Sequence, residues 1–435
     1  MAWFHECTFY QIYPLGFCGA ERENDFQKIT HRLGAVEREI PRLKELGVKA
    51  VLFNPLFSSS RHGYDTADFR VVDNRLGDND DFKRVCGMLH EAGLRVVLDG
   101  VFNHVGREFF AFKDVRERRE ASPYKDWFKI NFSGNSAYGD GFWYEGWEGH
   151  YDLVKLNLEN YDVQKYIYGS IKFWVDEFGI DGLRLDVGYL LPEWFLRDLT
   201  GFCKSLKPDF FIVAEAIHGD YNRMLNSGAD SVTNYECYKG LHSAINSGNL
   251  FEIEHSLSRQ FANTPWALYK GKHLMNFVDN HDVARIYSVI NDKRNVAAAF
   301  AVLFVMPGIP CIYYGSEYGA EGQKGDCDTH LRPAMSEIDV KAHPEIYETV
   351  KRLISLKASR KSLKYGSYDK VVLNNKYFCI KREDGGERTL LAVNISDEPV
   401  AMNVGGGLTD LLSGENADAN VSVEPHSYRI LGTKQ

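Results

Sequence analysis

Short runs of apolar residues recur along the chain, and each is followed by a stretch in which apolar residues return at helical spacing. A short, continuous apolar run is typical of a strand that is buried on both faces, as strands are in a parallel sheet. The pattern therefore predicts repeated strand–helix units. Eight such runs are present, at 9–13, 50–53, 95–99, 182–185, 210–214, 231–233, 274–278 and 311–314.

Helical periodicity fills the segments between these runs. The clearest helices are predicted at 36–46, 78–92, 161–178 and 295–305. Pro41 lies early in the first of them, and Gly47 and Gly93 lie where a left-handed residue commonly ends a helix before the next strand. Eight strand–helix units predict an α/β protein with a (β/α)8 TIM barrel, which places its active site at the carboxyl ends of the strands.

Two regions depart from the strand–helix alternation. The segment 105–156 is rich in glycine and aromatic residues and forms an insertion after the third predicted strand. From residue 361 to 435, short alternating strands are separated by turns, with a hairpin turn expected at Asp384-Gly385-Gly386. We therefore expect a barrel formed by 1–104 and 157–360, an insertion domain at 105–156, and a C-terminal antiparallel β domain at 361–435.

The charge balance limits the partners of this protein. The 435 residues carry a formal net charge of −9, without the clustered lysine and arginine that bind phosphate backbones or anionic lipid. The longest apolar run, 296–306, is too short to span a bilayer core of about 30 Å. We expect neither a nucleic acid nor a membrane as partner, and a neutral ligand instead.

The cysteines and the N-terminus bear on the cellular location. No basic segment followed by an apolar segment opens the chain, so a secretory signal is not expected. Eight cysteines, including Cys327, are scattered without a C-x-x-C pair. Buried, reduced thiols in a cytoplasmic protein explain this pattern best, and a zinc site or a disulfide framework is the second interpretation.

Four segments rich in acidic residues each close a predicted strand, at the third, fourth, fifth and seventh positions. In chain order they resemble the signature regions of the α-amylase family of glycoside hydrolases, and the resemblance spans nearly the whole chain. The segments are Asp99-Gly-Val-Phe-Asn103-His104, Gly182-Leu-Arg184-Leu-Asp186, Ala214-Glu215-Ala216 and Phe277-Val-Asp-Asn-His281-Asp282.

Two of these carboxylates suit glycoside hydrolysis with retention of configuration. That reaction needs one carboxylate to attack the anomeric carbon and a second, protonated carboxyl to deliver a proton to the leaving oxygen. We expect Asp186 to be the nucleophile and Glu215 the general acid/base. Arg184 lies two residues before Asp186 on the same strand, so its cation points to the same side and favours the ionised nucleophile.

The resemblance implies roles for further residues. Asp282 is the third family carboxylate, which grips sugar hydroxyls, and His104 and His281 look like hydroxyl-binding histidines. Asp99 is expected to orient Arg184, and Tyr64 to stack on the reacting ring. The alternatives are that the aspartates are strand-end caps, that two histidines among acids hold a metal, and that Tyr64 belongs to the core.

Other segments indicate the substrate. Leu153-Val-Lys-Leu-Asn157 resembles a stretch of neopullulanases and cyclomaltodextrinases. Asp328 and Arg332 resemble a pair that binds a donor-side glucose, although a surface ion pair fits them as well. We expect hydrolysis of α-1,4-glucosidic bonds in maltooligosaccharides, and of cyclodextrins or pullulan as further substrates. The alternatives are a transglycosylase, an exo-acting glucosidase, or an inactive sugar-binding barrel.

Departures from the family pattern limit what the resemblance implies. Gly188-Tyr189 replaces the Lys-His that follows the nucleophile in many α-amylases, so acceptor-side preferences do not carry over. Neopullulanase relatives bear an N-terminal β domain, which we do not expect here because the first barrel strand begins near residue 9.

Aromatic residues of the insertion and one asparagine complete the predictions. Trp147, Trp143 and Tyr144 suit stacking against glucose, or else form a local core; of the three we expect Trp147 to bind substrate. No cofactor is required by the predicted chemistry. Family members often hold calcium between barrel and insertion, and Asn103 matches one ligand position, so calcium is left open. The protein is expected to be a monomer or a homodimer.

Overall fold

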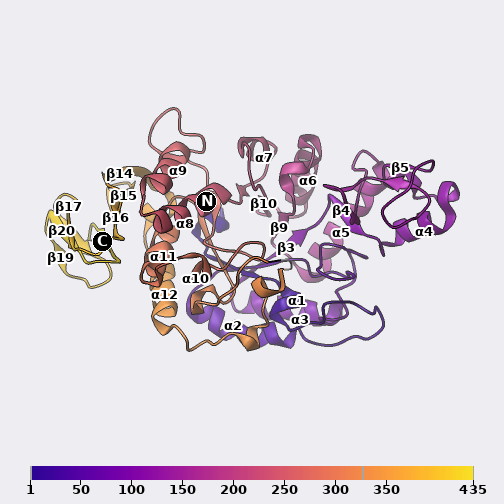
Figure 1. The fold of residues 1–435 in the computed structure, drawn as a ribbon, viewed down its shortest axis with the longest axis horizontal. Helices are drawn as coiled ribbons and strands as arrows, with labels where there is room; N and C mark the ends of the chain where they lie inside the picture. Colours follow the sequence, from indigo (N-terminus) through magenta and orange to yellow (C-terminus); the bar gives the residue numbers. More distant parts are fainter. Residues whose placement is uncertain (1, 326–327, 435) are drawn as a thin grey trace.

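Eight parallel strands form the centre of the computed structural model, which describes residues 2–325 and 328–434 (Figure 1). Their order around the sheet is β11-β10-β9-β3-β2-β1-β13-β12, and a parallel bridge between Thr233 and Met275 joins its two ends. The predicted barrel is thus confirmed. The strands are β1 Phe9–Ile12, β2 Ala50–Phe53, β3 Arg95–Gly100, β9 Gly182–Leu185, β10 Phe211–Ala214, β11 Ser231–Val232, β12 Met275–Asn276 and β13 Ile309–Tyr313.

Helices surround the strands and bury one apolar face each. The longest, α5, joins the insertion to β9 and buries Ile167, Ile171 and Trp174. The strands are buried along almost their whole length because helices cover their outer side and side chains fill the barrel interior. The main helices are α2 Gly34–Leu46, α3 Asn79–Glu91, α5 Tyr161–Phe178, α6 Glu193–Leu206, α8 Tyr235–Ser247, α9 Phe251–Phe261, α11 Val296–Val305 and α12 Pro344–Ser359.

The helix ends follow the predicted signals with one exception. Gly47 ends α2 with φ 94°, and Gly93 follows α3 with φ 80°, so both occupy the left-handed region that glycine tolerates. Pro41, however, lies inside α2, because that helix begins at Gly34, two residues before the predicted start. The apolar run that could not span a membrane is α11, which is buried. Among the described residues, no helix combines the length and the apolar character that a membrane crossing needs.

The insertion between β3 and β9 has its own small sheets and core at one end of the molecule (Figure 1). β4 His104–Gly106 pairs with β8 His150–Lys155, which also pairs with β7 Gly146–Trp147. Phe142 and Tyr144 are fully buried and pack edge-on against Phe112 of α4 Phe110–Arg118. Tyr144 is therefore part of a local core, which decides between the two interpretations of this residue.

Antiparallel strands form the opposite end of the molecule, as predicted (Figure 1). The expected hairpin turn is present, with Gly385 at φ 55° and Gly386 at φ 88° between β15 and β16. Both values require a residue that accepts positive φ, which explains the glycine pair. The main sheet contains β14 Ser367–Leu373, β15 Tyr377–Asp384, β16 Glu387–Asn394, β21 Ser427–Gly432, β18 Leu408–Asp410 and β19 Asn416–Ala417, and a second sheet pairs β17 Val400–Asn403 with β20 Asn420–Val423.

The described cysteines are all free thiols, and most are buried. Burial raises the pKa of the Cys7, Cys18, Cys203 and Cys379 thiols to about 12, so these thiols stay protonated at neutral pH. Cys327 lies outside the described residues. Protonated, buried thiols behave as small apolar side chains, which agrees with the first of the two interpretations given above for the cysteine pattern.

Candidate active site

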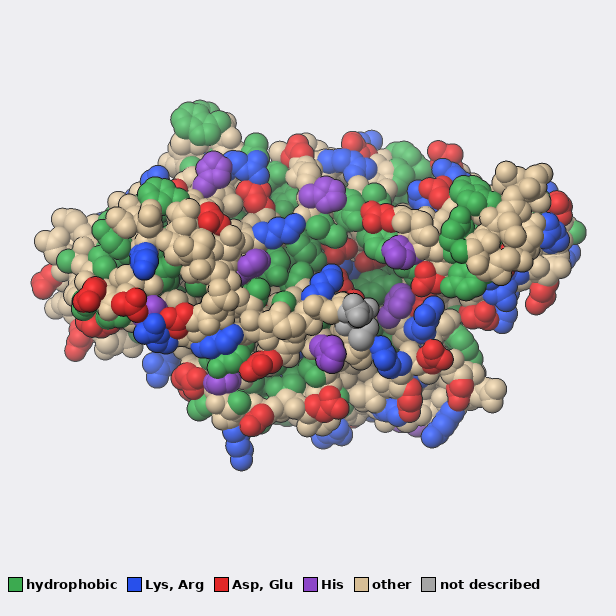
Figure 2. Space-filling view, in the orientation of Figure 1, with side chains coloured by type: hydrophobic (Ala, Val, Ile, Leu, Met, Phe, Trp, Pro, Cys, Tyr) green, Lys and Arg blue, Asp and Glu red, His purple; other side chains and the backbone are tan. Residues whose placement is uncertain are grey.

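The four acidic motifs meet at the carboxyl ends of the barrel strands. Asp99 ends β3, Asp186 and Glu215 directly follow β9 and β10, and Asp282 lies in the loop after β12. Figure 2 shows the corresponding face hollowed near the middle of the molecule, over β3 and β9, with acidic and hydrophobic side chains at the floor of the hollow. The adjacency of parallel strands β3, β9 and β10 is what brings three of these residues together.

Arg184 is the centre of the cluster. Its Nη1 lies 2.5 Å from Asp99 Oδ2 and 3.3 Å from Asp186 Oδ1, while its Nη2 lies 2.8 Å from Glu215 Oε1. None of the four side chains is more than 7% exposed. Because residues two apart on a strand point to the same side, Arg184 and Asp186 both face the barrel interior, as the sequence predicted.

The charge of Asp186 is set by opposing effects. Burial raises the pKa of the Asp186 carboxyl well above its usual value, the Arg184 guanidinium opposes this rise, and the Glu215 carboxylate adds to it. The Asp186 carboxyl therefore releases its proton at a higher pH than an exposed aspartate does.

A strained backbone turn links the two carboxyls. Val187 has φ 42° and ψ 41°, a left-handed conformation that β-branched residues rarely adopt. In this conformation its backbone N–H donates to Glu215 Oε2 at 2.9 Å. Val187 thus orients the Glu215 carboxyl, and its left-handed backbone conformation makes this hydrogen bond possible.

Asp282 is held by two cationic or polar partners. His281 Nε2 lies 3.0 Å from Asp282 Oδ2, and Arg332 Nη2 lies 2.8 Å from Asp282 Oδ1. Burial opposes the charge of Asp282, but His281 and Arg332 outweigh burial and lower its pKa well below the usual value. Asp282 is therefore ionised throughout the neutral range.

The predicted pair Asp328 and Arg332 joins this cluster. Arg332 Nη2 lies 3.1 Å from Asp328 Oδ2, and the Arg332 side chain is only 9% exposed. Its guanidinium carbon lies 4.5 Å from the centre of the Tyr13 ring, a cation–π contact. The contacts of Arg332 with Asp282 and Tyr13 exclude the interpretation of this pair as an isolated surface ion pair.

His104 and Trp147 line the cluster from the insertion side. His104 Nε2 lies 3.9 Å from Asp186 Oδ2, and the rings of His104 and Trp147 are 5.8 Å apart. Burial lowers the pKa of His104 to about 3, so the ring is neutral near pH 7. His104 Nε2 and Trp147 Nε1 are buried atoms without a hydrogen-bond partner among the described residues. Such atoms are ready to bind sugar hydroxyls.

Tyr64 connects Asp99 to His281. Its hydroxyl donates to Asp99 Oδ2 at 3.3 Å and forms a further hydrogen bond with His281 Nε2. Its ring is half-buried and stacks on the His281 ring at a centroid distance of 5.8 Å. Tyr64 is therefore part of the site cluster, and its partial exposure argues against a purely core role.

Two polar residues of the cluster were not predicted. Asn54 Nδ2 donates to Asp99 Oδ2 at 3.1 Å, and Gln11 Nε2 donates to Asn54 Oδ1 at 2.8 Å and lies 2.9 Å from His281 Nδ1. Both are buried. The sequence carried a signal for them, because Gln11 is the polar residue of an apolar strand and Asn54 directly follows β2.

Asn103, the predicted calcium-ligand position, contacts His104 and Leu156. Its amide Nδ2 donates toward His104 Nδ1 at 3.1 Å, and its backbone carbonyl accepts from Leu156. Calcium needs several oxygen ligands, usually including carboxylates. Among the described residues, the only group of three acidic, histidine or cysteine side chains close enough to share an ion lies elsewhere, at the start of α3.

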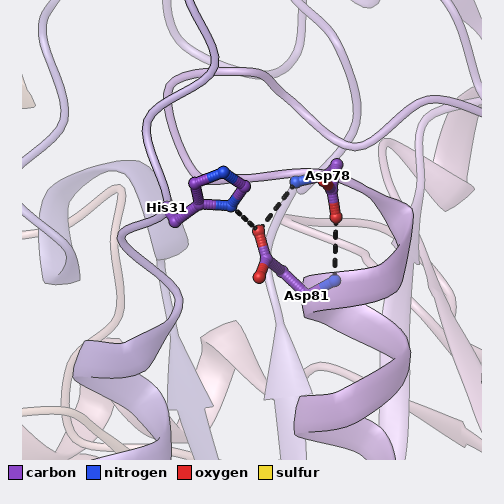
Figure 3. Close-up of side chains that lie close together, drawn as sticks. All are labelled: His31, Asp78 and Asp81. Carbon is purple, nitrogen blue, oxygen red and sulfur yellow. Dashed lines mark hydrogen bonds and ion pairs between the residues drawn. The ribbon is translucent and has the colours of Figure 1, made fainter.

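That group, shown in Figure 3, is explained by helix capping. The Asp78 side chain accepts from the Asp81 backbone N–H at 2.9 Å, and the Asp81 side chain accepts from the Asp78 backbone N–H at 3.1 Å. These contacts form a capping box in which Asp81 also pairs with His31 and Arg84, so helix capping accounts for the two carboxylates.

Comparison with known proteins gives two family matches. The profile described as "Alpha amylase, catalytic domain" matches residues 11–369, and the profile described as "Beta-galactosidase C-terminal domain" matches residues 379–432. The first match covers well over half of the chain and contains all four acidic motifs. The second covers most of the C-terminal antiparallel strands.

Individual relatives agree with the first match. A cyclomaltodextrinase of a Bacillus species is 31% identical over 422 residues, which cover 90% of this chain and 73% of that protein. Neopullulanase 2 of Thermoactinomyces vulgaris is 33% identical over 387 residues, covering 84% of this chain and 65% of that protein. A solved structure titled "Cyclomaltodextrinase" has a TM-score of 0.88 and 28% identity, covering 99% of this chain and 78% of that chain.

Proposed function

Because this chain belongs to the α-amylase family of glycoside hydrolases, we propose that it hydrolyses α-1,4-glucosidic bonds of maltooligosaccharides with retention of configuration. The observation that carries the proposal is the buried Arg184, whose guanidinium contacts both Asp186 and Glu215. A retaining mechanism needs two neighbouring carboxyls that share one proton between them. We assign these two roles to Asp186 and Glu215, which both contact Arg184.

In the proposed first step, an Asp186 oxygen attacks the anomeric carbon while the Glu215 carboxyl donates its proton to the departing glycosidic oxygen. The bond to the aglycone breaks and a glycosyl ester of Asp186 forms. In the second step, Glu215 accepts a proton from water, whose oxygen attacks the same carbon and releases Asp186. Arg184 favours the ionised form of Asp186 during release, because it is the nearest cation.

The remaining residues would bind the sugar. Asp282 is ionised and suits the hydroxyl groups of the reacting glucose, and His104 and Trp147 offer buried donors without a partner among the described residues. Asp328 and Arg332 would extend the donor side. Members of this family need no organic cofactor, and no step of this mechanism uses a metal.

The names of the relatives suggest further substrates. A cyclomaltodextrinase and a neopullulanase both match this chain at 31% and 33% identity, so we propose cyclodextrins and pullulan as further substrates. Their names are those of hydrolases, which favours transfer to water over transfer to a second sugar. With reduced, buried cysteines, we propose that the enzyme acts on short dextrins in the cytoplasm.

Stereochemistry and substrate preference test the proposal together. Proton NMR during hydrolysis of maltotriose should show the α-anomer of the new reducing end first; initial release of the β-anomer would exclude retention. Rates on maltotriose, maltohexaose, β-cyclodextrin, pullulan and soluble starch should be highest, per cleavable bond, on the short linear or cyclic substrates. A higher kcat/KM per bond on starch than on maltohexaose would contradict the short-substrate proposal alone.

The general acid is tested by Glu215→Gln. This variant should lose activity on maltotriose by several orders of magnitude, while kcat/KM on α-maltosyl fluoride should fall much less, because fluoride leaves without a proton. An equal loss on both substrates would assign Glu215 another role.

A further inference from the structure

A second side chain contacts Glu215 from inside the barrel. Tyr235, the first residue of α8, is only 4% exposed, and its hydroxyl lies 3.5 Å from Glu215 Oε1. Val187 and Tyr235 contact different oxygens of the Glu215 carboxyl and come from different parts of the barrel, because Val187 follows β9 whereas α8 follows β11. The sequence motifs gave no indication of this tyrosine.

Asn280 determines which way the Tyr235 hydroxyl points. The Asn280 side-chain oxygen accepts from the Asp282 backbone N–H at 2.9 Å, which fixes the orientation of the amide group. Its Nδ2 then donates to the Tyr235 oxygen at 3.0 Å. With that oxygen acting as acceptor, the Tyr235 proton is left to be donated, and Glu215 Oε1 is the acceptor in reach.

The Glu215 carboxyl borders a small cavity inside the barrel. The cavity measures about 20 Å³, and Tyr235, Asn280 and Thr233 form part of its wall together with Glu215. A space of this size holds one water molecule or a displaced carboxyl oxygen. The hydrogen bond from Tyr235 fixes Glu215 Oε1 and so limits a displacement of the carboxyl.

The helix cap and the packing of its ring fix the position of Tyr235. Asn234 caps α8 by accepting from the Cys237 backbone N–H at 3.2 Å, and its amide donates to Gln260 at 3.0 Å and to Asn276 at 2.8 Å. The Tyr235 ring packs edge-on against Phe277 at 4.9 Å. Because capping and ring packing both fix the start of α8, the hydroxyl is presented at a constant position.

We propose that Tyr235, oriented by Asn280, is a positioning residue that holds the Glu215 carboxyl toward the substrate. Through Asn280 the same contacts connect Glu215, which follows β10, to the backbone of Asp282 after β12, so that the two carboxylates keep a fixed separation across the barrel. This inference rests on the proposed role of Glu215 as general acid/base. Hydrogen bonds at a site of this kind shorten when substrate is bound, which suits the long distance found here.

The test is Tyr235→Phe, with Tyr238→Phe as the matched control. Tyr238 lies on the same helix and stacks on the same Phe277 ring at 5.2 Å, but it is not in contact with Glu215. For Tyr235→Phe, kcat/KM on maltotriose should fall about 3- to 10-fold, the value of one hydrogen bond. On α-maltosyl fluoride kcat/KM should stay at the wild-type value, because kcat/KM reports the steps up to fluoride departure, which needs no proton.

The control variant should match the wild type on both substrates. Loss on both substrates by the same factor would assign Tyr235 a merely structural role, and no loss on maltotriose would show that it does not position Glu215; either result overturns the proposal. If Tyr235→Phe does not fold, Asn280→Ser, whose hydroxyl oxygen can still accept from the Asp282 backbone N–H, should show the same split between the two substrates. Glu215→Gln in the same assays distinguishes failure of this inference from failure of the proposed function. If Glu215→Gln loses far more activity on maltotriose than on the fluoride and Tyr235→Phe shows no such difference, only the positioning role of Tyr235 is rejected.

Discussion

Replacing Arg184 with glutamine tests how much this residue contributes to the free energy of unfolding. The guanidinium contacts Asp99, Asp186 and Glu215 together, and its side chain is 4% exposed. Glutamine keeps part of the length and a donor but removes the charge. Three buried carboxyls are then left without their shared cation, and water replaces it poorly because none of these side chains is more than 7% exposed.

The expected loss can be estimated from buried ion pairs. Removing one partner of such a pair costs about 3–5 kcal/mol of unfolding free energy, because a buried charge is left uncompensated. The cost depends on pH. Burial already raises the pKa of Asp186 in the folded state, and loss of the opposing cation raises it further. The folded variant then binds more protons than the unfolded chain above about pH 4, where unfolded carboxyls ionise, so its stability falls as pH rises toward 7.

Urea unfolding at pH 5 and at pH 7 measures this effect. The difference in unfolding free energy between wild type and Arg184→Gln should be larger at pH 7 than at pH 5. Lys172→Gln serves as the control, because Lys172 and Asp176 form an exposed pair on α5, with side chains 55% and 53% exposed, worth about 0.3–0.5 kcal/mol. A loss below about 1 kcal/mol at pH 7, or a loss independent of pH, would refute the reasoning about a buried, uncompensated cluster.

Two further predictions follow from other buried groups. Asp186→Asn should fold normally, which circular dichroism checks, but should lose kcat/KM on maltotriose by several orders of magnitude; retention of more than about a few per cent of the wild-type rate would contradict its role as nucleophile. Lys357 donates to the Gly308 and Leu363 carbonyls, and burial lowers its pKa well below the usual value. The folded protein thus binds fewer protons at Lys357 than the unfolded chain, so this residue contributes stability that grows as pH rises from 7 to 10. In urea unfolding, the stability of the wild type relative to Lys357→Met should increase over this range; equal pH slopes for the two proteins would be the contrary result.

Local sequence patterns were sufficient for the barrel and its acidic cluster. The strands were predictable because buried parallel strands leave uninterrupted apolar runs, and β2 and β9 have the predicted bounds. Asp99, Asp186 and Glu215 were predictable because each ends such a run. Their convergence then follows from topology, since the carboxyl ends of neighbouring parallel strands lie at one edge of the sheet.

Contacts between distant segments were not predictable in the same way. Arg332 reaches Asp282 from 50 residues further along the chain, and Tyr235 reaches Glu215 across 20 residues from the start of a helix. Neither residue breaks an apolar run or ends a strand. Their roles depend on where a loop or a helix begins relative to the barrel, which is decided by tertiary packing and not by local periodicity. Pro41 is a related case, because a helix can continue past a proline when the surrounding packing stabilises it.

The balance of charge at the site connects these contacts to the proposed reaction. Four buried or half-buried carboxyl groups, Asp99, Asp186, Glu215 and Asp282, face two cations, Arg184 and Arg332. The excess of carboxyls over cations contributes to the raised pKa of Asp186, because the charges of Glu215 and Asp99 add to the effect of burial. It also means that the site attracts additional positive charge. In the proposed reaction, a glycosidic bond that breaks toward an oxocarbenium-like state develops such charge at the anomeric carbon, which Asp186 would attack. The cluster is therefore more complementary to the transition state than to the neutral substrate, which is the condition for lowering the barrier.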